Sequence, residues 1–344
     1  MNRERLYRLT RDRLGHVLPN LQVNGCLMLA RLLSGELNRQ YSHVLFVENA
    51  LQEVDYTLVQ QCQGAGMELV QTDYITPDLL LEHGCTGAIL YNVTNHPGLG
   101  QAVPSIYYSY GVYDPDTKCE LVVPCSKFAA RHGRRGPYPE VLDEEWIVPP
   151  MLATRPLRRL KGVSHPYTVG IYTSGSNDKY PSKLVIELLG SLPAGTGILV
   201  STLPKYRHPG VHLALEGRTT KYGSLAGCPV RLDATVPYMI NADLVIYGSA
   251  PDHYEPYGRI VVEAMALGKP VICERKGIFG EVLEHGVNAV LYDTTDDILN
   301  LVEWLRSDTN TATKLGVNAQ LWASWHDTTV HIGKLKRIMK MLGI

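Results

Sequence analysis

Two glutamates stand eight residues apart in the stretch EPYGRIVVEAMALGKPVI, at Glu255 and Glu263. The stretch is otherwise apolar, and charged side chains are seldom buried without a partner. A helix that begins at Pro256 would place Glu255 just before its first turn and Glu263 two turns along. Eight residues at the rise of a helix span about 12 Å, a length that resembles a nucleotide sugar from ribose to hexose. A carboxylate can accept hydrogen bonds from two vicinal hydroxyls, so we expect Glu263 to hold a ribose diol.

The expected start of this helix carries a second feature suited to the same ligand. The free N–H groups and the dipole of a helix N-terminus attract phosphate. We therefore expect Glu255 and the backbone amides of Tyr257 and Gly258 to face the sugar and phosphate end, with Gly258 allowing close approach. The alternative is structural: Glu255 caps the helix and Glu263 faces solvent on an amphipathic surface.

Short β-like runs alternate with helical runs along the whole chain, which predicts parallel sheets covered by helices. The runs are apolar and β-branched, as in strands buried on both faces. Strands are expected at 43–49, 67–71, 87–93, 105–111, 120–126, 167–172, 197–201, 242–248, 270–274 and 288–293. Helices are expected at 23–35, 52–64, 77–83, 181–192, 236–241, 256–267, 296–306 and 327–344.

The segment 146–167 holds four prolines and a basic cluster without periodicity, which is typical of a linker. We therefore predict an α/β protein with two doubly wound, Rossmann-like domains, 1–155 and 156–322. Ligands in such sheets bind beyond the carboxyl ends of the strands. Residues 323–344 are expected to form a helix with a basic face that packs back toward the first domain, or that touches an anionic membrane surface.

Composition and charge exclude several classes of protein. The chain has 344 residues, 45% hydrophobic and 19% charged, with a net charge of −1, as in an ordinary globular protein. No apolar run is long enough for a transmembrane segment, and the basic first 18 residues do not resemble a signal peptide. Seven cysteines without a CxxC pair indicate reduced thiols, and His and Cys never cluster at zinc-ligand spacing, so we expect no metal and a cytoplasmic location.

The stretch from Glu255 to Tyr292 resembles the signature of group 1 (family four) retaining glycosyltransferases, which have the GT-B fold. The matching features are the glutamate pair, Ala-Met-Ala-x-Gly-x-Pro-Val-Ile, a glycine-rich turn and, before a last strand, Glu-Val-Leu-Glu-His-Gly at the place of the family's Glu-x-Val-x-x-Gly. The resemblance covers about 60 residues specifically, and its two-domain layout fits most of the chain. It implies two Rossmann-like domains that face a central cleft.

The resemblance also implies roles for the residues of the stretch. Glu263 would bind the ribose hydroxyls, and Glu255 would lie at the donor sugar and its diphosphate. The loop KGIFGE would lie at the donor sugar, with the backbone amides of Ile278, Phe279 and Gly280 near the phosphates.

A basic pair that grips the diphosphate in this family is only half present. Lys179 matches the lysine of the pair, but Ser174 stands where the arginine is expected. Because the pair neutralises the leaving group, Lys205 or Arg207 in the loop STLPKYRHPG would have to replace the arginine. Otherwise they are solvated loop charges.

The first domain matches the family less well. A Gly-Gly loop of the family is represented only by Asn24-Gly25, where Gly25 could let backbone approach the donor. The His-Gly that positions the donor sugar corresponds to Tyr110-Gly111, and a tyrosine hydroxyl can donate to a sugar hydroxyl but takes no proton near neutral pH. We count Tyr110 with Glu255 and Lys179 as catalytic residues, and His96 in the nearby TNHPGLG loop is another candidate for the missing histidine.

In the family, a retaining transfer moves a sugar from a nucleoside diphosphate without an essential metal or cofactor. We therefore expect a UDP, GDP or ADP sugar as donor and a hydroxyl of a glycan or lipid-linked glycan as acceptor. An acceptor surface is expected at an aromatic cluster and a basic loop of the first domain, together with the basic N-terminus; these residues are Tyr107, Tyr108, Tyr110, Tyr113, Arg131, Arg134 and Arg135. The alternative is that these tyrosines belong to the core and the arginines to a solvated loop.

Three other functions stay open at this point. A transferase that modifies hydroxylated DNA bases would use the same aromatic and basic residues on nucleic acid. A catalytically weak GT-B protein that binds nucleotide sugar without turnover would explain Ser174 and Tyr110. A nucleotide-sugar hydrolase or epimerase would need a carboxylate pair from the first domain, for which the sequence has no motif.

Overall fold

The computed structural model divides the chain into two compact units, residues Met1–Ala153 with His326–Ile344 and residues Thr154–Trp325. It describes residues 12–18, 25–48, 56–91, 93, 96, 98–109, 119, 121–132, 147–149, 167–171, 187–188, 191–192, 196–200, 239–240 and 242–344. The expected boundaries lay at 155/156 and 322/323, close to those of the structure.

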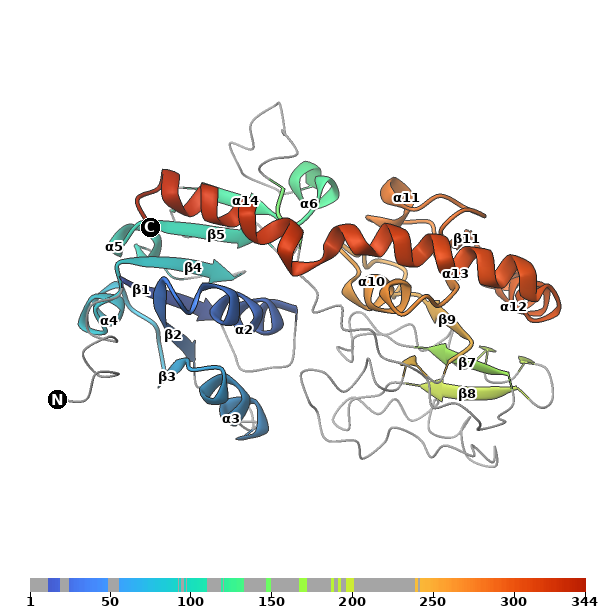
Figure 1. Ribbon diagram of the computed structural model, residues 1–344, viewed down its shortest axis with the longest axis horizontal. Helices are drawn as coiled ribbons and strands as arrows, with labels where there is room; N and C mark the ends of the chain where they lie inside the picture. The colour runs from blue at the N-terminus through green and yellow to red at the C-terminus, as the bar shows by residue number, and fades with distance from the viewer. Residues whose placement is uncertain are drawn as a thin grey trace. The chain divides into compact units, whose positions relative to one another are not determined.

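The first unit is built on a parallel sheet of six strands in the order β3-β2-β1-β4-β5-β6 (Figure 1). The strands are β1 (Asp12–Leu18), β2 (Tyr41–Glu48), β3 (Glu68–Thr72), β4 (Gly87–Tyr91), β5 (Ser105–Ser109) and β6 (Leu121–Pro124). Its helices are α2 (Gly25–Leu37), α3 (Tyr56–Gly64), α4 (Pro77–Glu82), α5 (Leu99–Ala102), α6 (Lys127–His132) and α14 (Thr328–Met341). This strand order is that of a doubly wound dinucleotide-type fold.

The second unit has a parallel sheet in the order β11-β10-β9-β7-β8. Its strands are β7 (Thr168–Ile171), β8 (Gly197–Val200), β9 (Leu244–Tyr247), β10 (Val271–Glu274) and β11 (Val290–Tyr292). Its helices are α10 (Arg259–Ala266), α11 (Phe279–Val282), α12 (Thr295–Ser307) and α13 (Thr309–Ala323), followed by the 3-10 turn Ser324–His326. A core of aliphatic side chains from β7, β9, α12 and α13 fills the space between sheet and helices.

All ten expected strands are present in the described residues, but the central strand of the first unit was missed. Asp12–Leu18 forms β1, and its side chains from Leu14 to Leu18 are buried. The basic character of the N-terminal sequence hid this strand. Arg13 is paired with Glu68, and His16 is buried within a polar network, so neither prevents strand formation.

His16 forms a buried hydrogen-bonded chain across three strands. Its Nδ1 lies 2.9 Å from the hydroxyl of Tyr91, and its Nε2 lies 3.0 Å from Nδ1 of His43. Burial, and then the charge of His43, lowers the pKa of His16 well below its ordinary value. The imidazole is therefore neutral in the folded protein and ready to bind a proton when the chain unfolds.

We expect the unfolding free energy to fall as the pH drops below about 6.5, because the unfolded state then binds a proton at His16 and the folded state does not. The neutral His16 makes its full contribution to the unfolding free energy above about pH 6.5. Below that pH, the slope of the unfolding free energy reaches about 1.4 kcal/mol per pH unit. Urea unfolding at pH 7.5, 6.5 and 5.5 measures this slope. His16→Gln should be less stable at every pH but should show a flatter slope, and an unchanged slope would contradict the assignment.

The last helix belongs to the first unit. The side chain of Asp327 caps α14 by accepting from Thr329 N at 2.9 Å, and the helix contacts α2. At the C-terminus, Ile344 fills the space beside Gly87, where an added Cβ would lie 2.5 Å from its side chain. Lys336, Arg337 and Lys340 are exposed along the helix, so the expected basic face is present, and its contact with a membrane stays a prediction. No described helix is long and apolar enough to cross a bilayer.

Candidate functional site in the second unit

The loop between β9 and α10 holds Glu255, and the helix begins later than expected. α10 starts at Arg259, not at Pro256, because Gly258 adopts the left-handed conformation with φ 73° and ψ 49°. An added Cβ on Gly258 would lie 2.2 Å from the ring of Phe279, so only glycine fits. The 12 Å estimate assumed a continuous helix from Glu255 to Glu263 and does not apply.

The carboxylate of Glu255 is buried and held by three groups of the loop and the strand. Tyr247 Oη donates to Oε2 at 2.8 Å, Gly258 N donates to Oε1 at 3.2 Å, and His253 Nε2 lies 3.4 Å from Oε2. Burial, and then the charge of Glu255, raises the pKa of Tyr247 well above its ordinary value, so the phenol stays a donor. The Gly258 amide is therefore engaged by Glu255, contrary to our expectation that it faces a phosphate, and Tyr257 is buried as well.

The backbone of Glu255 lies against the loop that precedes α11. Ile278 N donates to Glu255 O at 3.0 Å, so this amide is not available to a phosphate as expected. Gly277 has φ +59°, and an added Cβ there would lie 2.6 Å from Glu255 O. Within the described residues, the amides of Phe279 and Gly280 have no protein acceptor and remain candidates for phosphate binding.

A second carboxylate and a lysine adjoin this loop, and sequence reasoning missed both. Glu274 ends β10, is 6% exposed, and accepts from Ser249 N at 3.1 Å. Lys276 Nζ lies 3.4 Å from Glu274 Oε2 and donates to Ala250 O at 2.8 Å. Burial raises the pKa of Glu274 despite its hydrogen bonds and the nearby lysine. Glu274 is the last residue of a buried strand and Lys276 lies two residues beyond it, at the carboxyl edge of the sheet where binding residues gather.

Glu263 lies one turn into α10 and pairs with a residue of its own helix. Arg259 Nε donates to Glu263 Oε1 at 2.6 Å, and both side chains are only 12–13% exposed. This ion pair orients one carboxylate oxygen of Glu263. Binding of ribose hydroxyls by Glu263 stays a prediction.

Replacing Glu263 by glutamine should weaken UDP binding about tenfold, because a charge-assisted hydrogen bond contributes about 1.5–3 kcal/mol. If the contact is to the ribose diol, the wild type should prefer UDP over 2′-deoxy-UDP, and Glu263→Gln should lose this preference. Calorimetric titration with the two nucleotides measures both effects. Glu284→Gln, at an exposed position of the same unit, serves as the control. An equal preference in wild type and Glu263→Gln would contradict the ribose assignment.

The expected basic groups of this site lie outside the described residues. They are Lys179, Lys205 and Arg207, and Ser174, which stands at the place of the family's arginine, also lies outside the described residues. Their roles therefore stay predictions. The described residues contain no group of three or more His, Cys, Asp or Glu side chains arranged to hold a metal ion.

Comparison with known proteins bears directly on this part of the chain. Residues 232–322, which include both glutamates and the loop before α11, match the family of group 1 glycosyl transferases. This part of the chain is therefore similar to group 1 glycosyl transferases. A comparison with curated protein sequences found no match.

Solved structures extend the similarity to both units. HepE of Anabaena in complex with UDP and glucose is 17% identical, with a TM-score of 0.72 over 96% of this chain and 99% of that one. A glycosyltransferase from Rickettsia africae is 14% identical, with a TM-score of 0.68 over 97% and 99%. A putative UDP-N-acetylglucosamine 2-epimerase from Listeria monocytogenes is 10% identical, with a TM-score of 0.58 over 92% and 94%. The chain therefore has the GT-B fold, as predicted.

The structure of the first unit corrects the expected acceptor surface. Tyr107 and Tyr108 belong to β5 and are 0% and 1% exposed, so they form core and not a binding surface. The hydroxyl of Tyr108 donates to Val148 O within that core. Gly25 begins α2 and Arg131 lies in the last turn of α6. Tyr110, Tyr113, Arg134 and Arg135 lie outside the described residues.

Glu48 is the carboxylate that sequence reasoning missed in the first unit. It ends β2, and its Oε1 lies 2.6 Å from His96 Nε2, with side-chain exposures of 18% and 6%. His96, expected only as a substitute for a family histidine, is thus fixed by an acid at the carboxyl edge of the sheet. An acid directly after the buried run HVLFV was the available signal.

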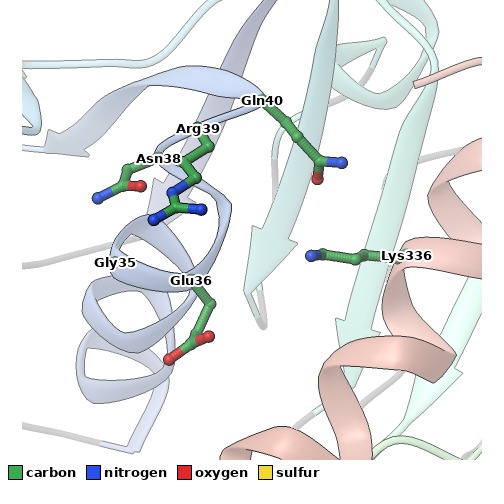
Figure 2. A pocket seen from close by; sticks show the side chains of 6 residues that line it. All are labelled: Gly35, Glu36, Asn38, Arg39, Gln40 and Lys336. Carbon is green, nitrogen blue, oxygen red and sulfur yellow. The ribbon is translucent and has the colours of Figure 1, made fainter.

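A hollow of about 510 Å³ lies elsewhere in the first unit, between the end of α2 and α14 (Figure 2). Its lining is polar and consists of Gly35, Glu36, Asn38, Arg39, Gln40 and Lys336. Gln40 immediately precedes β2, so the hollow lies at the amino edge of the sheet. It is therefore separate from the carboxyl edge, where ligands of such sheets bind.

Proposed function

We propose that this protein is a retaining glycosyltransferase that moves a hexose-type sugar from a UDP sugar to a hydroxyl acceptor without an essential metal. The observation that carries the proposal is the fixed Glu255 carboxylate after β9, eight residues before the Glu263 that pairs with Arg259, within the stretch that matches group 1 glycosyl transferases. UDP is favoured because HepE was solved with UDP-glucose and the Staphylococcus aureus protein MnaA with UDP.

In the proposed reaction, the acceptor hydroxyl attacks the anomeric carbon from the side of the leaving group. The new bond joins the acceptor oxygen to this carbon, and the bond to the β-phosphate oxygen breaks. The acceptor proton passes to a phosphate oxygen, so no side chain serves as a base. Preorganised donors near the leaving group supply the main stabilisation of the transition state.

The protein groups that meet the leaving diphosphate are assigned as follows. The amides of Phe279 and Gly280 bind phosphate oxygens, and Lys179 supplies positive charge. Lys276, held beside the loop by Ala250 O and Glu274, adds charge that Ser174 does not provide. Arg207 is the alternative, and the roles of Tyr110 and Gly25 at the donor stay predictions.

A second candidate function is epimerisation or hydrolysis of a UDP sugar. The similarity to a putative UDP-N-acetylglucosamine 2-epimerase favours it, and Glu48 with His96 offers an acid and a base in the first unit. An epimerase returns a sugar still attached to UDP and needs no acceptor. Transfer instead releases UDP in proportion to the product.

A thermal-shift screen with UDP, GDP and ADP sugars tests the proposed donor. A ligand that binds the folded state raises the melting temperature by mass action, by an amount set by its concentration relative to Kd. UDP sugars should give the largest shift. A larger shift with GDP or ADP sugars would contradict the choice of base, and the absence of a shift with all three would contradict the donor class.

A further inference from the structure

Two loops at the carboxyl edge of the first sheet meet at Glu48. Glu48 is the last residue of β2, Tyr74 lies in the turn after β3, and His96 lies beyond the end of β4. β3 is the neighbour of β2, and β1 lies between β2 and β4. Parallel strands bring their carboxyl ends to one edge, where sheets of this kind bind ligands.

The carboxylate of Glu48 contacts both the segment beyond β4 and the turn after β3. Its Oε1 lies 2.6 Å from His96 Nε2 and accepts from Ile75 N at 3.0 Å. The His96 side chain is 6% exposed and cannot turn away from the carboxylate without losing a buried, charge-assisted contact. The ring of His96 therefore has a fixed orientation.

The ring of Tyr74 lies flat against this fixed imidazole. The two ring centroids are 4.8 Å apart and the planes differ by 10°. Thr72 Oγ1 donates to Tyr74 O at 3.1 Å, which fixes the backbone of the turn. Tyr74 is nevertheless 49% exposed, so one ring face is supported while much of the ring remains open to solvent.

An acceptor of hydrogen bonds accompanies this exposed ring. Both hydrogen bonds to Glu48 use Oε1, and among the described residues no protein donor binds its Oε2. The side chain of Glu48 is 18% exposed, so solvent or a ligand hydroxyl can reach it. The edge of the sheet thus offers a flat aromatic face with a carboxylate oxygen next to its support.

This combination suits a neutral saccharide better than a nucleic acid. The apolar C–H face of a pyranose can cover an aromatic ring, while a carboxylate accepts from its hydroxyls. A nucleic-acid strand would also stack on the ring, but it would bring phosphates toward Glu48 and the exposed Asp73. Binding of nucleic acid depends on positive charge at the phosphates, which this turn does not supply.

We propose that Tyr74 and Glu48 form a saccharide subsite, with His96 as the positioning residue that supports the ring. The inference rests on the proposed transferase function and names its acceptor class, because the subsite lies on the unit expected to hold the acceptor. The acceptor is accordingly a glycan, and its sugar ring stacks on Tyr74.

The test uses the full-length protein and a glycan array of neutral oligosaccharides, probed with and without saturating UDP. The oligosaccharide bound most tightly by the wild type is then titrated into variants. Tyr74→Ala should bind it about tenfold more weakly, the loss expected for about 1.4 kcal/mol of stacking. Tyr74→Phe should stay within about threefold of the wild type, because the ring is kept.

Two further variants separate this subsite from a general loss of structure. Leu81→Ala removes a side chain of similar exposure, 53%, from α4 and should leave saccharide binding unchanged. His96→Gln should weaken saccharide binding, and Tyr74 fluorescence or NMR signals should show a more mobile ring. UDP affinity should be unchanged in all of these variants.

The proposal is overturned if no oligosaccharide binds, if Tyr74→Ala binds it as well as the wild type, or if the variant instead loses binding to single-stranded DNA. Failure of the proposed function has a different signature. In that case the wild type would not bind UDP, whereas the effect of Tyr74→Ala on saccharide binding could still be measured.

Discussion

Replacing Glu255 by glutamine should lower kcat by about a hundredfold or more while leaving the Kd for UDP within about threefold of the wild type. The amide has nearly the shape of the carboxylate, and its single oxygen can still accept from either Tyr247 Oη or Gly258 N. It lacks the negative charge that would face positive charge developing at the anomeric carbon. The loss should therefore fall on the transition state rather than on binding of the nucleotide.

Initial rates and calorimetric titration with UDP measure the two effects of this substitution separately. Glu284→Gln is the matched control, because it removes an exposed carboxylate of the same domain and should leave both quantities unchanged. A Glu255→Gln protein with wild-type kcat would refute a catalytic role. A large loss of UDP affinity with unchanged kcat would make Glu255 a binding residue.

The substitution Gly277→Ala should be nearly as damaging, through the backbone of Glu255. An alanine Cβ at this position would lie 2.6 Å from Glu255 O and 2.9 Å from Glu255 N, at a φ of +59°. The left-handed conformation costs an alanine about 1 kcal/mol, and overpacking adds about 1–3 kcal/mol. We expect the unfolding free energy to fall by about 2–4 kcal/mol and kcat to fall with it, because relief of the clash moves Glu255.

Gly286→Ala separates the clash from the backbone conformation. Gly286 also has a positive φ of +78°, but an added Cβ there has no neighbour within 4 Å. This control should lose about 1 kcal/mol of stability and keep full activity. Urea unfolding and initial rates on both variants measure the difference. Equal losses of stability and activity at the two glycines would mean that the clash with Glu255 contributes nothing to either loss.

The sequence pattern predicted the parallel architecture because buried strands of such sheets are continuous apolar runs. It failed at β1, where Arg13 and His16 interrupt the run and find their partners, Glu68 and Tyr91, more than fifty residues away. Pairing between distant residues leaves no periodicity in the local sequence.

The tyrosines of the first unit also show that the local sequence does not reveal contacts between distant residues. Tyr107 and Tyr108 lie in a predicted strand, and a central parallel strand is buried on both faces, so neither could form an exposed surface. Tyr74 follows a strand and sits in a turn, where exposure is common. Its support by His96 and Glu48 arises only when the turn after β3 and the segment beyond β4 meet at the end of β2, which the sequence order does not reveal.

The sequence predicted which residues lie around Glu255 but not the hydrogen bonds that they make. The spacing of Glu255 and Glu263 identified both glutamates, yet the left-handed Gly258 delayed the helix start. As a result, the amides of Gly258 and Ile278 bind Glu255 itself. A helix start shifted by three residues was enough to change which donors could face a ligand.

The most direct test of the account is an NMR time course of UDP-glucose with the wild-type protein and an oligosaccharide acceptor. The account predicts that the anomeric signal of the donor decays as UDP forms, and that a new signal appears for an α-linked glucose on the acceptor. An intact donor despite tight binding, or an epimerised sugar still attached to UDP, would contradict it.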